Sequence, residues 1–164
     1  MRVLGTVFLA TALIELCAPA SASPALPANG EAKLAAFQVC RPLAVIEMGA
    51  AGSESATECH GIVKNRDGQN LLDNLAIHCL ENSSTRPDEH TYSGTCVQTD
   101  GDGDKLFVTY EGSKTGHFKW IGGTGKYKNV AGSGNLRVVV APAGASDLFA
   151  YTLDFDGAFT NKPK

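Results

Sequence analysis

Two histidines stand beside two cysteines in mirror-image order along the chain. Cys59-His60 and His78-Cys79 flank the segment NRDGQN, whose residue types are typical of a turn. If the two flanking segments are strands that pair symmetrically about this turn, His60 faces His78 on one side of the sheet and Cys59 faces Cys79 on the other. The sequence therefore predicts a pair of imidazoles on one sheet face.

Two imidazoles on one face would hold zinc or copper if a third ligand came near. His60 and His78 are the predicted metal ligands, and His90 or His117 is the candidate for the third position. The competing interpretation is that both histidines simply accompany disulfide cysteines, because a register slip of one residue separates the imidazoles. Both interpretations stay open at the level of sequence.

Four cysteines remain once a predicted leader is removed: Cys40, Cys59, Cys79 and Cys96. An even number of cysteines in an exported chain predicts two disulfides. A Cys59–Cys79 bond would leave the other two on strands that are not neighbours in a meander, whereas Cys40–Cys59 and Cys79–Cys96 bonds would join adjacent strands. The connectivity itself is not determined by the sequence. A metal-thiolate site is disfavoured because no C-x-x-C pair is present.

Aromatic side chains and one histidine gather in the second half of the chain. A barrel mouth lined by such residues would grip an apolar or aromatic ligand by its face, while a histidine or tyrosine fixed one polar end. Packing of a core explains the same residues equally well. The candidate ligand-binding residues are Phe107, Tyr110, His117, Trp120 and Tyr127.

Two glycine-containing motifs resemble binding loops without completing them. GGTGKY lacks the glycine five residues before Gly125 and the Ser or Thr after Lys126 that a phosphate-binding loop needs. In DGDGD at 100–104, the spacing from the first aspartate to Glu111 fits a calcium loop, but Lys105 replaces the required glycine at the sixth position. We interpret both motifs as strand connections, with a weak cation site as the alternative for the acidic turn.

Composition and motif content exclude several function classes. The net charge of −3 offers no electrostatic footprint for nucleic acid. The chain contains no G-x-S-x-G and no H-E-x-x-H motif, and oxidised cysteines are not nucleophiles. We therefore expect no cofactor and no conventional hydrolase chemistry, and whether the protein is an enzyme stays open, with a non-enzyme favoured.

The beginning of the chain is typical of a secretory signal. Residues 1–22 carry an early arginine, a short apolar run and small residues before the expected cleavage point, and the run is too short for a membrane span. We expect residues 23–33 to be a flexible lead and residues 34–160 to form the folded domain. The mature chain then has no integral membrane segment and resides in the periplasm or is secreted. Its oligomeric state is not determined.

Short apolar runs separated by turn residues predict an all-β domain that positions these side chains. Eight strands in sequence with short connections form either an up-and-down barrel or a two-sheet sandwich. We favour the barrel because closure removes exposed strand edges. The segment around 70–80 fits both the strand and the helix period, and we assign it as a strand. The predicted strands are 35–47, 56–64, 71–80, 90–99, 105–111, 115–121, 130–140 and 148–159.

Residues 92–136 resemble a pattern found in small exported bacterial proteins of unknown function and in the allene oxide cyclase and dirigent barrels of the calycin type. The resemblance lies in an Asp-Gly-Asp turn, an aromatic strand, the GGTGKY segment and a Gly-x-Gly. It implies an eight-stranded barrel with an internal cavity. Members of these families that do chemistry act on hydrophobic or phenolic intermediates without metal or organic cofactor. The resemblance assigns no catalytic residue here.

Three functions follow as expectations. The first is non-catalytic binding of a small apolar or amphipathic ligand. The second is a cofactor-free isomerase or cyclase that uses His117 or a tyrosine for proton transfer. The third is a structural or interaction protein whose interior is packed solid. A cavity of several hundred Å³ with converging polar groups would favour the first two over the third.

Overall fold

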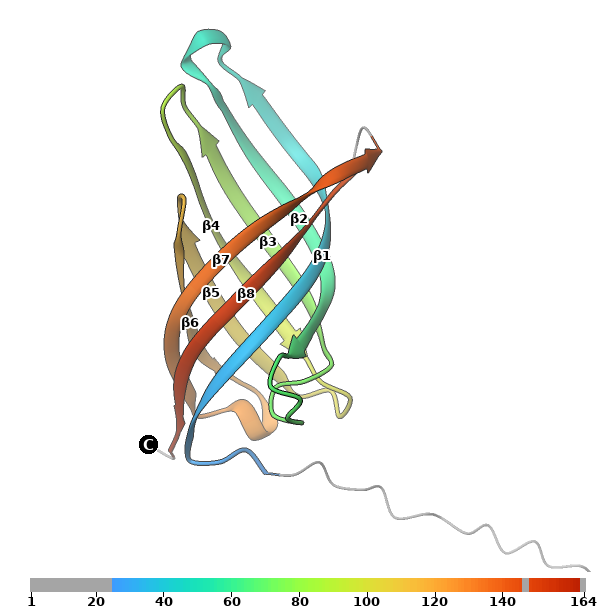
Figure 1. Cartoon of the computed structure of the whole chain (residues 1–164), viewed down its shortest axis with the longest axis vertical. Helices are drawn as coiled ribbons and strands as arrows, with labels where there is room; N and C mark the ends of the chain where they lie inside the picture. Colours follow the sequence, from blue (N-terminus) through green and yellow to red (C-terminus); the bar gives the residue numbers. More distant parts are fainter. Residues whose placement is uncertain (1–24, 146–147, 163–164) are drawn as a thin grey trace, which may run out of the picture.

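The eight predicted strands are all present, and each pairs antiparallel with the next one along the chain (Figure 1). The computed structural model describes residues 25–145 and 148–162, so the predicted signal segment lies outside the described residues. β1 also pairs with β8, from Asn29 opposite Thr160 to Cys40 opposite Phe149, and this pairing closes the barrel. The up-and-down barrel is confirmed, and the sandwich is excluded. The strands are β1 (Asn29–Glu47), β2 (Ser53–Asn65), β3 (Leu75–Thr85), β4 (His90–Thr99), β5 (Lys105–Gly112), β6 (Gly116–Gly123), β7 (Val130–Ala145) and β8 (Leu148–Asn161).

Most strands are longer than predicted, β3 by five residues at its end and β7 by five residues at its end, and the beginnings of β1 and β3 differ most from the prediction. β1 begins at Asn29, five residues before the expected domain start, because β8 pairs with it along that stretch. β3 begins at Leu75 rather than at 71, because the preceding residues form a loop in which Leu72 and Asn74 have positive φ angles of 52° and 56°. Asp73 fastens this loop by accepting a hydrogen bond from the Asn65 backbone amide at 2.8 Å.

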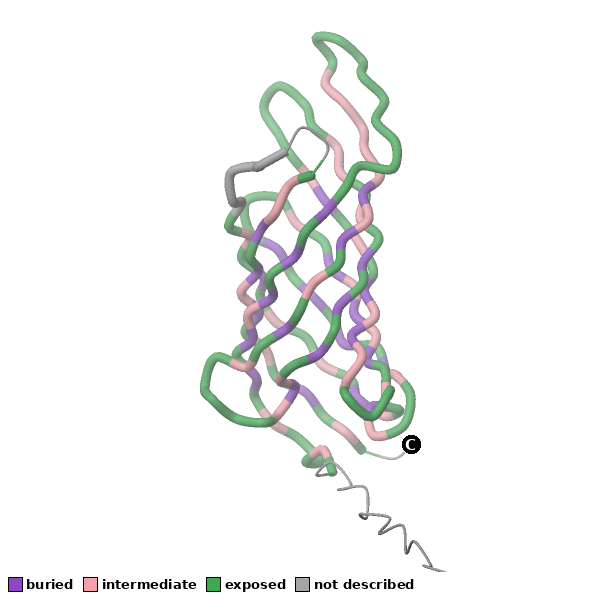
Figure 2. Tube along the Cα trace, turned by 90° about the vertical axis from the view of Figure 1, so that its right-hand side faces the viewer, coloured by how far each residue is buried: buried purple, intermediate pink, exposed green. Residues whose placement is uncertain are grey.

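Buried and exposed residues alternate along the strands within the barrel (Figure 2), whereas residues 41–47 of β1 are all exposed. In β5, Leu106, Val108 and Tyr110 are buried inside, as the alternation of the sequence predicts. The part of the interior below the barrel mouth is filled by aromatic rings. Phe118 meets Trp120 and Phe155 edge-on at centroid distances of 4.7 and 5.3 Å.

The two ends of the barrel differ. At one end, which we call the mouth, lie the β1–β2, β3–β4, β5–β6 and β7–β8 connections, and the first two hairpins extend well beyond the barrel (Figure 1). β1 leaves β8 after Cys40 and continues with β2 alone, and Pro42 stands at the register shift where this extension starts. A proline is tolerated there because that edge of β1 needs no amide for a neighbouring strand.

Among the described residues, no helix has the length and apolar character to cross a membrane.

At the opposite end, the acidic turn and the GGTGKY segment bind each other. The Lys126 ammonium lies 2.6 Å from Asp100 Oδ2 and 3.0 Å from Asp102 Oδ2, so a lysine occupies the centre of the acidic turn. Gly125 has a φ of +49°, and a Cβ there would lie 1.8 Å from Asp104 Oδ1. Residues Gly125–Tyr127 form the short helical turn η2. Both motifs are strand connections, as the sequence analysis interpreted them.

Candidate functional site

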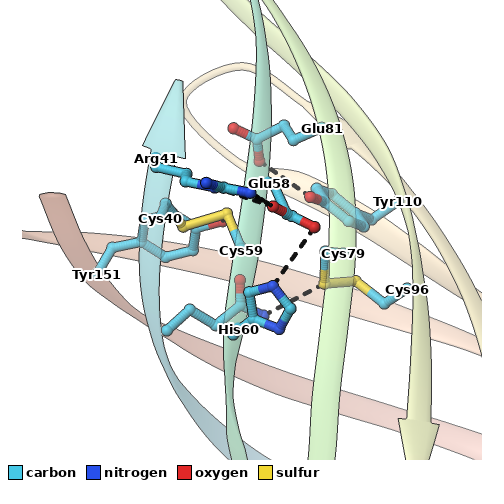
Figure 3. The surroundings of a disulfide bond; sticks show 11 residues. Cys40, Arg41, Glu58, Cys59, His60, Cys79, Glu81, Cys96, Tyr110 and Tyr151 are labelled. Carbon is cyan, nitrogen blue, oxygen red and sulfur yellow. Dashed lines mark hydrogen bonds and ion pairs between the residues drawn. A yellow bond between two sulfur atoms is a disulfide. The ribbon is translucent and has the colours of Figure 1, made fainter. Parts of the chain in front are cut away.

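A row of four inward-facing cysteines crosses four neighbouring strands. Cys40 lies opposite Cys59, Cys59 opposite Cys79, and Cys79 opposite Cys96. Disulfides join Cys40 to Cys59 and Cys79 to Cys96, each across a Cα–Cα distance of 4.1 Å (Figure 3). Gln38, which is buried on β1, donates a hydrogen bond from its side-chain amide to Cys79 Sγ at 3.5 Å. Two disulfides therefore cross-link one wall of the barrel. Of the two connectivities considered from the sequence, the structure has the one that joins adjacent strands.

Glu81 projects into the barrel from β3, two residues beyond Cys79. The Tyr110 hydroxyl donates a hydrogen bond to Glu81 Oε2 at 3.0 Å (Figure 3). Gly94 lies between them, opposite Glu81 on one side and Tyr110 on the other. A Cβ on Gly94 would lie 2.4 Å from the Tyr110 hydroxyl oxygen, so the absence of a side chain on β4 lets the tyrosine reach across it.

The environment of Glu81 favours its neutral form. Burial raises the pKa of the Glu81 carboxyl, and the hydroxyls of Tyr110 and Tyr151 together with the nearby His90 only partly offset this. Burial, reinforced by the charge of Glu81, also raises the pKa values of Tyr110 and Tyr151. The site thus combines a carboxyl whose pKa is raised with phenols that stay protonated. Such a carboxyl is suited to accepting and returning a proton.

Two further tyrosines complete the polar side of the site. The Tyr151 hydroxyl lies 3.2 Å from Cys59 Sγ. The Tyr92 hydroxyl is buried and has no hydrogen-bond partner among the protein atoms of the described residues. It lies over Gly112 and Gly116, where added Cβ atoms would approach its oxygen to 2.7 and 2.6 Å. The two glycines that flank the β5–β6 turn therefore make room for this ring.

These side chains line a cavity of about 270 Å³ that opens at the mouth. One side of it is polar, with Glu81 and the three tyrosines, and the other is apolar. A larger depression of about 440 Å³ lies nearby, but serine, threonine, asparagine and glutamate side chains dominate its wall. The smaller cavity is the better candidate site because it combines an apolar wall with converging polar groups. Its lining is Glu81, His90, Tyr92, Tyr110, Ser113, Lys114, Val138, Phe149, Tyr151 and Leu153.

The five predicted ligand-binding residues do not share one cavity. Tyr110 lines the mouth cavity. Trp120 is buried in the aromatic core, and Tyr127 is buried at the opposite end of the barrel in η2. Phe107 and His117 lie on the outer face of the wall, alternating with inward neighbours. His117 therefore does not face the interior, where the sequence analysis considered it for proton transfer.

Sequence reasoning missed Glu81, Tyr92 and Tyr151. A signal for Glu81 was available, because it has the same strand parity as the inward-facing Ile77 and Cys79. Tyr92 has the same strand parity as Cys96, and Tyr151 the same parity as Leu153, so alternation also places both tyrosines inside. Tyr151 approaches Glu81 only because β8 closes against β1, far from β3 in the chain.

The predicted register of the histidine pair is confirmed. His60 lies opposite His78, and their rings stack at a centroid distance of 4.4 Å with an interplanar angle of 7°. The third ligand-type group beside them is Glu58, whereas the sequence analysis looked to His90 or His117. His90 instead lies at the mouth, where its Nδ1 is 3.0 Å from the Thr85 hydroxyl.

Comparison with known proteins identifies the fold. No protein-family model and no curated protein matches the sequence. The solved structure of the pterocarpan synthase dirigent protein PsPTS1 aligns with a TM-score of 0.54 and 12% identity, over 82% of this chain and 97% of that one. That of the pterocarpan synthase dirigent protein GePTS1 aligns with a TM-score of 0.52 and 11% identity, over 87% and 99%. The chain therefore forms a dirigent-like barrel, in agreement with the resemblance carried by residues 92–136.

Proposed function

We propose that this protein binds a small aromatic or apolar molecule bearing a hydroxyl group in the mouth cavity. The observation that carries the proposal is a half-buried carboxyl at one side of a cavity of about 270 Å³ whose other side is apolar. Such a site gains affinity by burying apolar surface and selects orientation through a few polar groups. The structural alternative with a solid interior is disfavoured, because packing is solid only below the mouth.

Different lining residues would bind the apolar part and the hydroxyl group of the ligand. Phe149 and Tyr151, whose rings lie 6.0 Å apart at an angle of 29°, offer faces for an aromatic ring. The hydroxyl of the ligand would donate to the Glu81 carboxylate or accept from the Tyr92 hydroxyl, which the protein leaves without a partner among its described residues. A ligand without a hydroxyl would bury the same apolar surface but leave these polar groups unpaired.

A matched pair of probes tests the proposal. We expect 4-propylphenol to shift the NMR resonances of the mouth residues saturably, and propylbenzene to bind at least about tenfold more weakly, which corresponds to about 1.4 kcal/mol. Val138→Phe should fill part of the cavity and weaken binding of the phenol. Val139→Phe is the control, because Val139 points outward and is 47% exposed. Absence of saturable binding, or equal effects of the two variants, would contradict the proposal.

A second candidate function is cofactor-free isomerisation or cyclisation, which the raised pKa of Glu81 favours. In this case Glu81 would accept a proton from the bound molecule and return it at another atom, while Tyr110 stabilised negative charge. The test is exchange of the acidic carbon-bound protons of 2-tetralone in D₂O, followed by NMR. Catalysis predicts exchange above the buffer rate that Glu81→Gln abolishes, and exchange at the buffer rate rules out this function for such ketones.

We also infer that the protein works outside the cytosol, in the periplasm or as a secreted protein. The two disulfides support this inference, because such bonds persist in oxidising compartments. Amino-terminal sequencing of the protein from its native source should find a mature chain that begins near Ser23. An intact amino terminus on protein with free thiols would contradict it.

A further inference from the structure

The outer face of the barrel carries a compact group of ligand-type side chains that the mouth cavity does not use. Behind the inward row of cysteines, a second row runs across the same four strands on the outside: Val39, His60, His78 and Val97. The two histidines form the middle of this row. Glu58, the next outward-facing residue on β2, lies beside both of them, and Figure 3 shows its approach to His60.

The distances within this group suit a transition metal ion. Glu58 Oε1 lies 3.1 Å from His78 Nε2 and 3.5 Å from His60 Nε2, and the three ligand atoms all lie within 4.8 Å of one another. A tetrahedral site with bonds of about 2.0–2.1 Å separates its ligand atoms by about 3.3 Å. Both edges from the carboxylate therefore already have the length that zinc requires.

A second contact orients the carboxylate. Arg41 Nη2 and Nε donate to Glu58 Oε2 at 2.7 and 3.0 Å, so the arginine holds one oxygen and leaves Oε1 directed at the imidazoles. Such fixing of a ligand by a neighbouring group is the arrangement that tunes metal sites. The imidazole side chains are 62% and 51% exposed, and the Nε2 atoms of both already face Glu58 Oε1, so the site is open to an ion from solvent.

We propose that Glu58, His60 and His78 bind one late first-row divalent metal ion, Cu²⁺ or Zn²⁺, on the outer face of the barrel. Two imidazoles and one carboxylate match the preference of these ions, and the general affinity order places Cu²⁺ above Zn²⁺. Ca²⁺ and Mg²⁺ are excluded because they require mainly oxygen ligands. A fourth position faces solvent. The ion would join β2 to β3, the one neighbouring pair in the cysteine row that no disulfide bridges.

The test uses tag-free mature protein with both disulfides intact. We expect isothermal titration with CuSO₄ and with ZnCl₂ to give one site per chain, and MgCl₂ to give no heat of binding. His60→Asn and His78→Asn should each weaken Zn²⁺ binding by about tenfold or more, the range in which changes at a metal site commonly fall. His117→Asn is the matched control, because His117 is also an exposed histidine on the outer face but lies on β6.

Two readouts separate the proposed site from adventitious binding. The electron paramagnetic resonance spectrum of the Cu²⁺ protein should report two imidazole nitrogens in the wild type and fewer in each single variant. Saturating Zn²⁺ should raise the melting temperature of the wild type and of His117→Asn but not of the His60→Asn/His78→Asn double variant, because an ion that binds only the folded state stabilises it. Circular dichroism of each apo variant checks that the barrel is folded.

The proposal is overturned if the wild type binds neither ion saturably. It is equally overturned if the double variant keeps the wild-type affinity, or if His117→Asn loses as much affinity as His60→Asn.

Discussion

Replacement of Tyr110 by phenylalanine tests the central contact of the mouth cavity. The Tyr110 side chain is 6% exposed, and its hydroxyl donates to Glu81 Oε2 at 3.0 Å. A hydrogen bond to a charged group contributes about 1.5–3 kcal/mol to stability, and one to a neutral group about 0.5–1.5 kcal/mol. The hydroxyl should therefore stabilise the Glu81 carboxylate by about 1 kcal/mol more than it stabilises the carboxylic acid.

This difference makes the effect of the substitution depend on pH. Because about 1.4 kcal/mol corresponds to a change of one in pKa, the loss of about 1 kcal/mol in Tyr110→Phe should raise the pKa of Glu81 by a further ~0.7. The pKa of Glu81 in the folded protein already lies above its ordinary value, so the folded state loses stability as the pH rises through that pKa. Without the hydroxyl this loss is larger. The cost of Tyr110→Phe is thus smallest in acid and largest where Glu81 is ionised.

Urea unfolding at about pH 4 and about pH 8 measures the cost of the substitution, as the difference in free energy of unfolding between the wild type and Tyr110→Phe at each pH. A carboxyl ¹³C NMR titration of Glu81 gives the pKa directly. Tyr92→Phe is the control, because the protein atoms of the described residues offer its hydroxyl no partner, and it should cost little at either pH. An equal cost of Tyr110→Phe at both pH values, with an unchanged Glu81 pKa, would refute the reasoning.

Two further predictions concern the framework around the site. Cys40→Ala/Cys59→Ala removes a disulfide that spans a sequence separation of 19 residues. Loop-closure entropy predicts that the free energy of unfolding falls by about 3 kcal/mol. A fall of less than about 1 kcal/mol in urea titration would contradict this explanation. In the acidic turn, burial acts to raise the pKa of Asp100, but hydrogen bonds from Lys126 and from backbone amides outweigh it and lower that pKa. The resulting stability is present above the ordinary aspartate pKa and is lost as the pH falls through the lowered value. Lys126→Met should therefore destabilise the protein at neutral pH and have a smaller effect in strong acid, and a pH-independent effect in thermal melts would count against this pairing.

Much of the barrel follows from local chemistry alone. Period-two alternation between turn residues predicts all eight strands, because a strand exposes successive side chains on opposite faces. The mirror order of the segments around residues 59–60 and 78–79 predicts that His60 faces His78, because a hairpin pairs residues symmetrically about its turn. At residues 71–74 the period-two pattern was misleading. The backbone there forms a loop with positive φ angles, and the Asn65 backbone amide at the end of β2 donates a hydrogen bond to the Asp73 side chain.

The candidate site depended on tertiary structure. Alternation places Glu81 on the inward face. Its pKa is raised by burial inside the closed barrel, and Tyr151 becomes its neighbour because β8 returns to pair with β1. The aromatic residues that cluster in the sequence lie apart in the structure. Phe107 points outward because strand positions alternate, and Tyr110 and Tyr127 lie at opposite ends of the barrel. Likewise the partner of the acidic turn is Lys126, some twenty residues away. Sequence determines which face a residue occupies, because strand parity is local; barrel closure determines what that residue meets, because those neighbours come from remote strands.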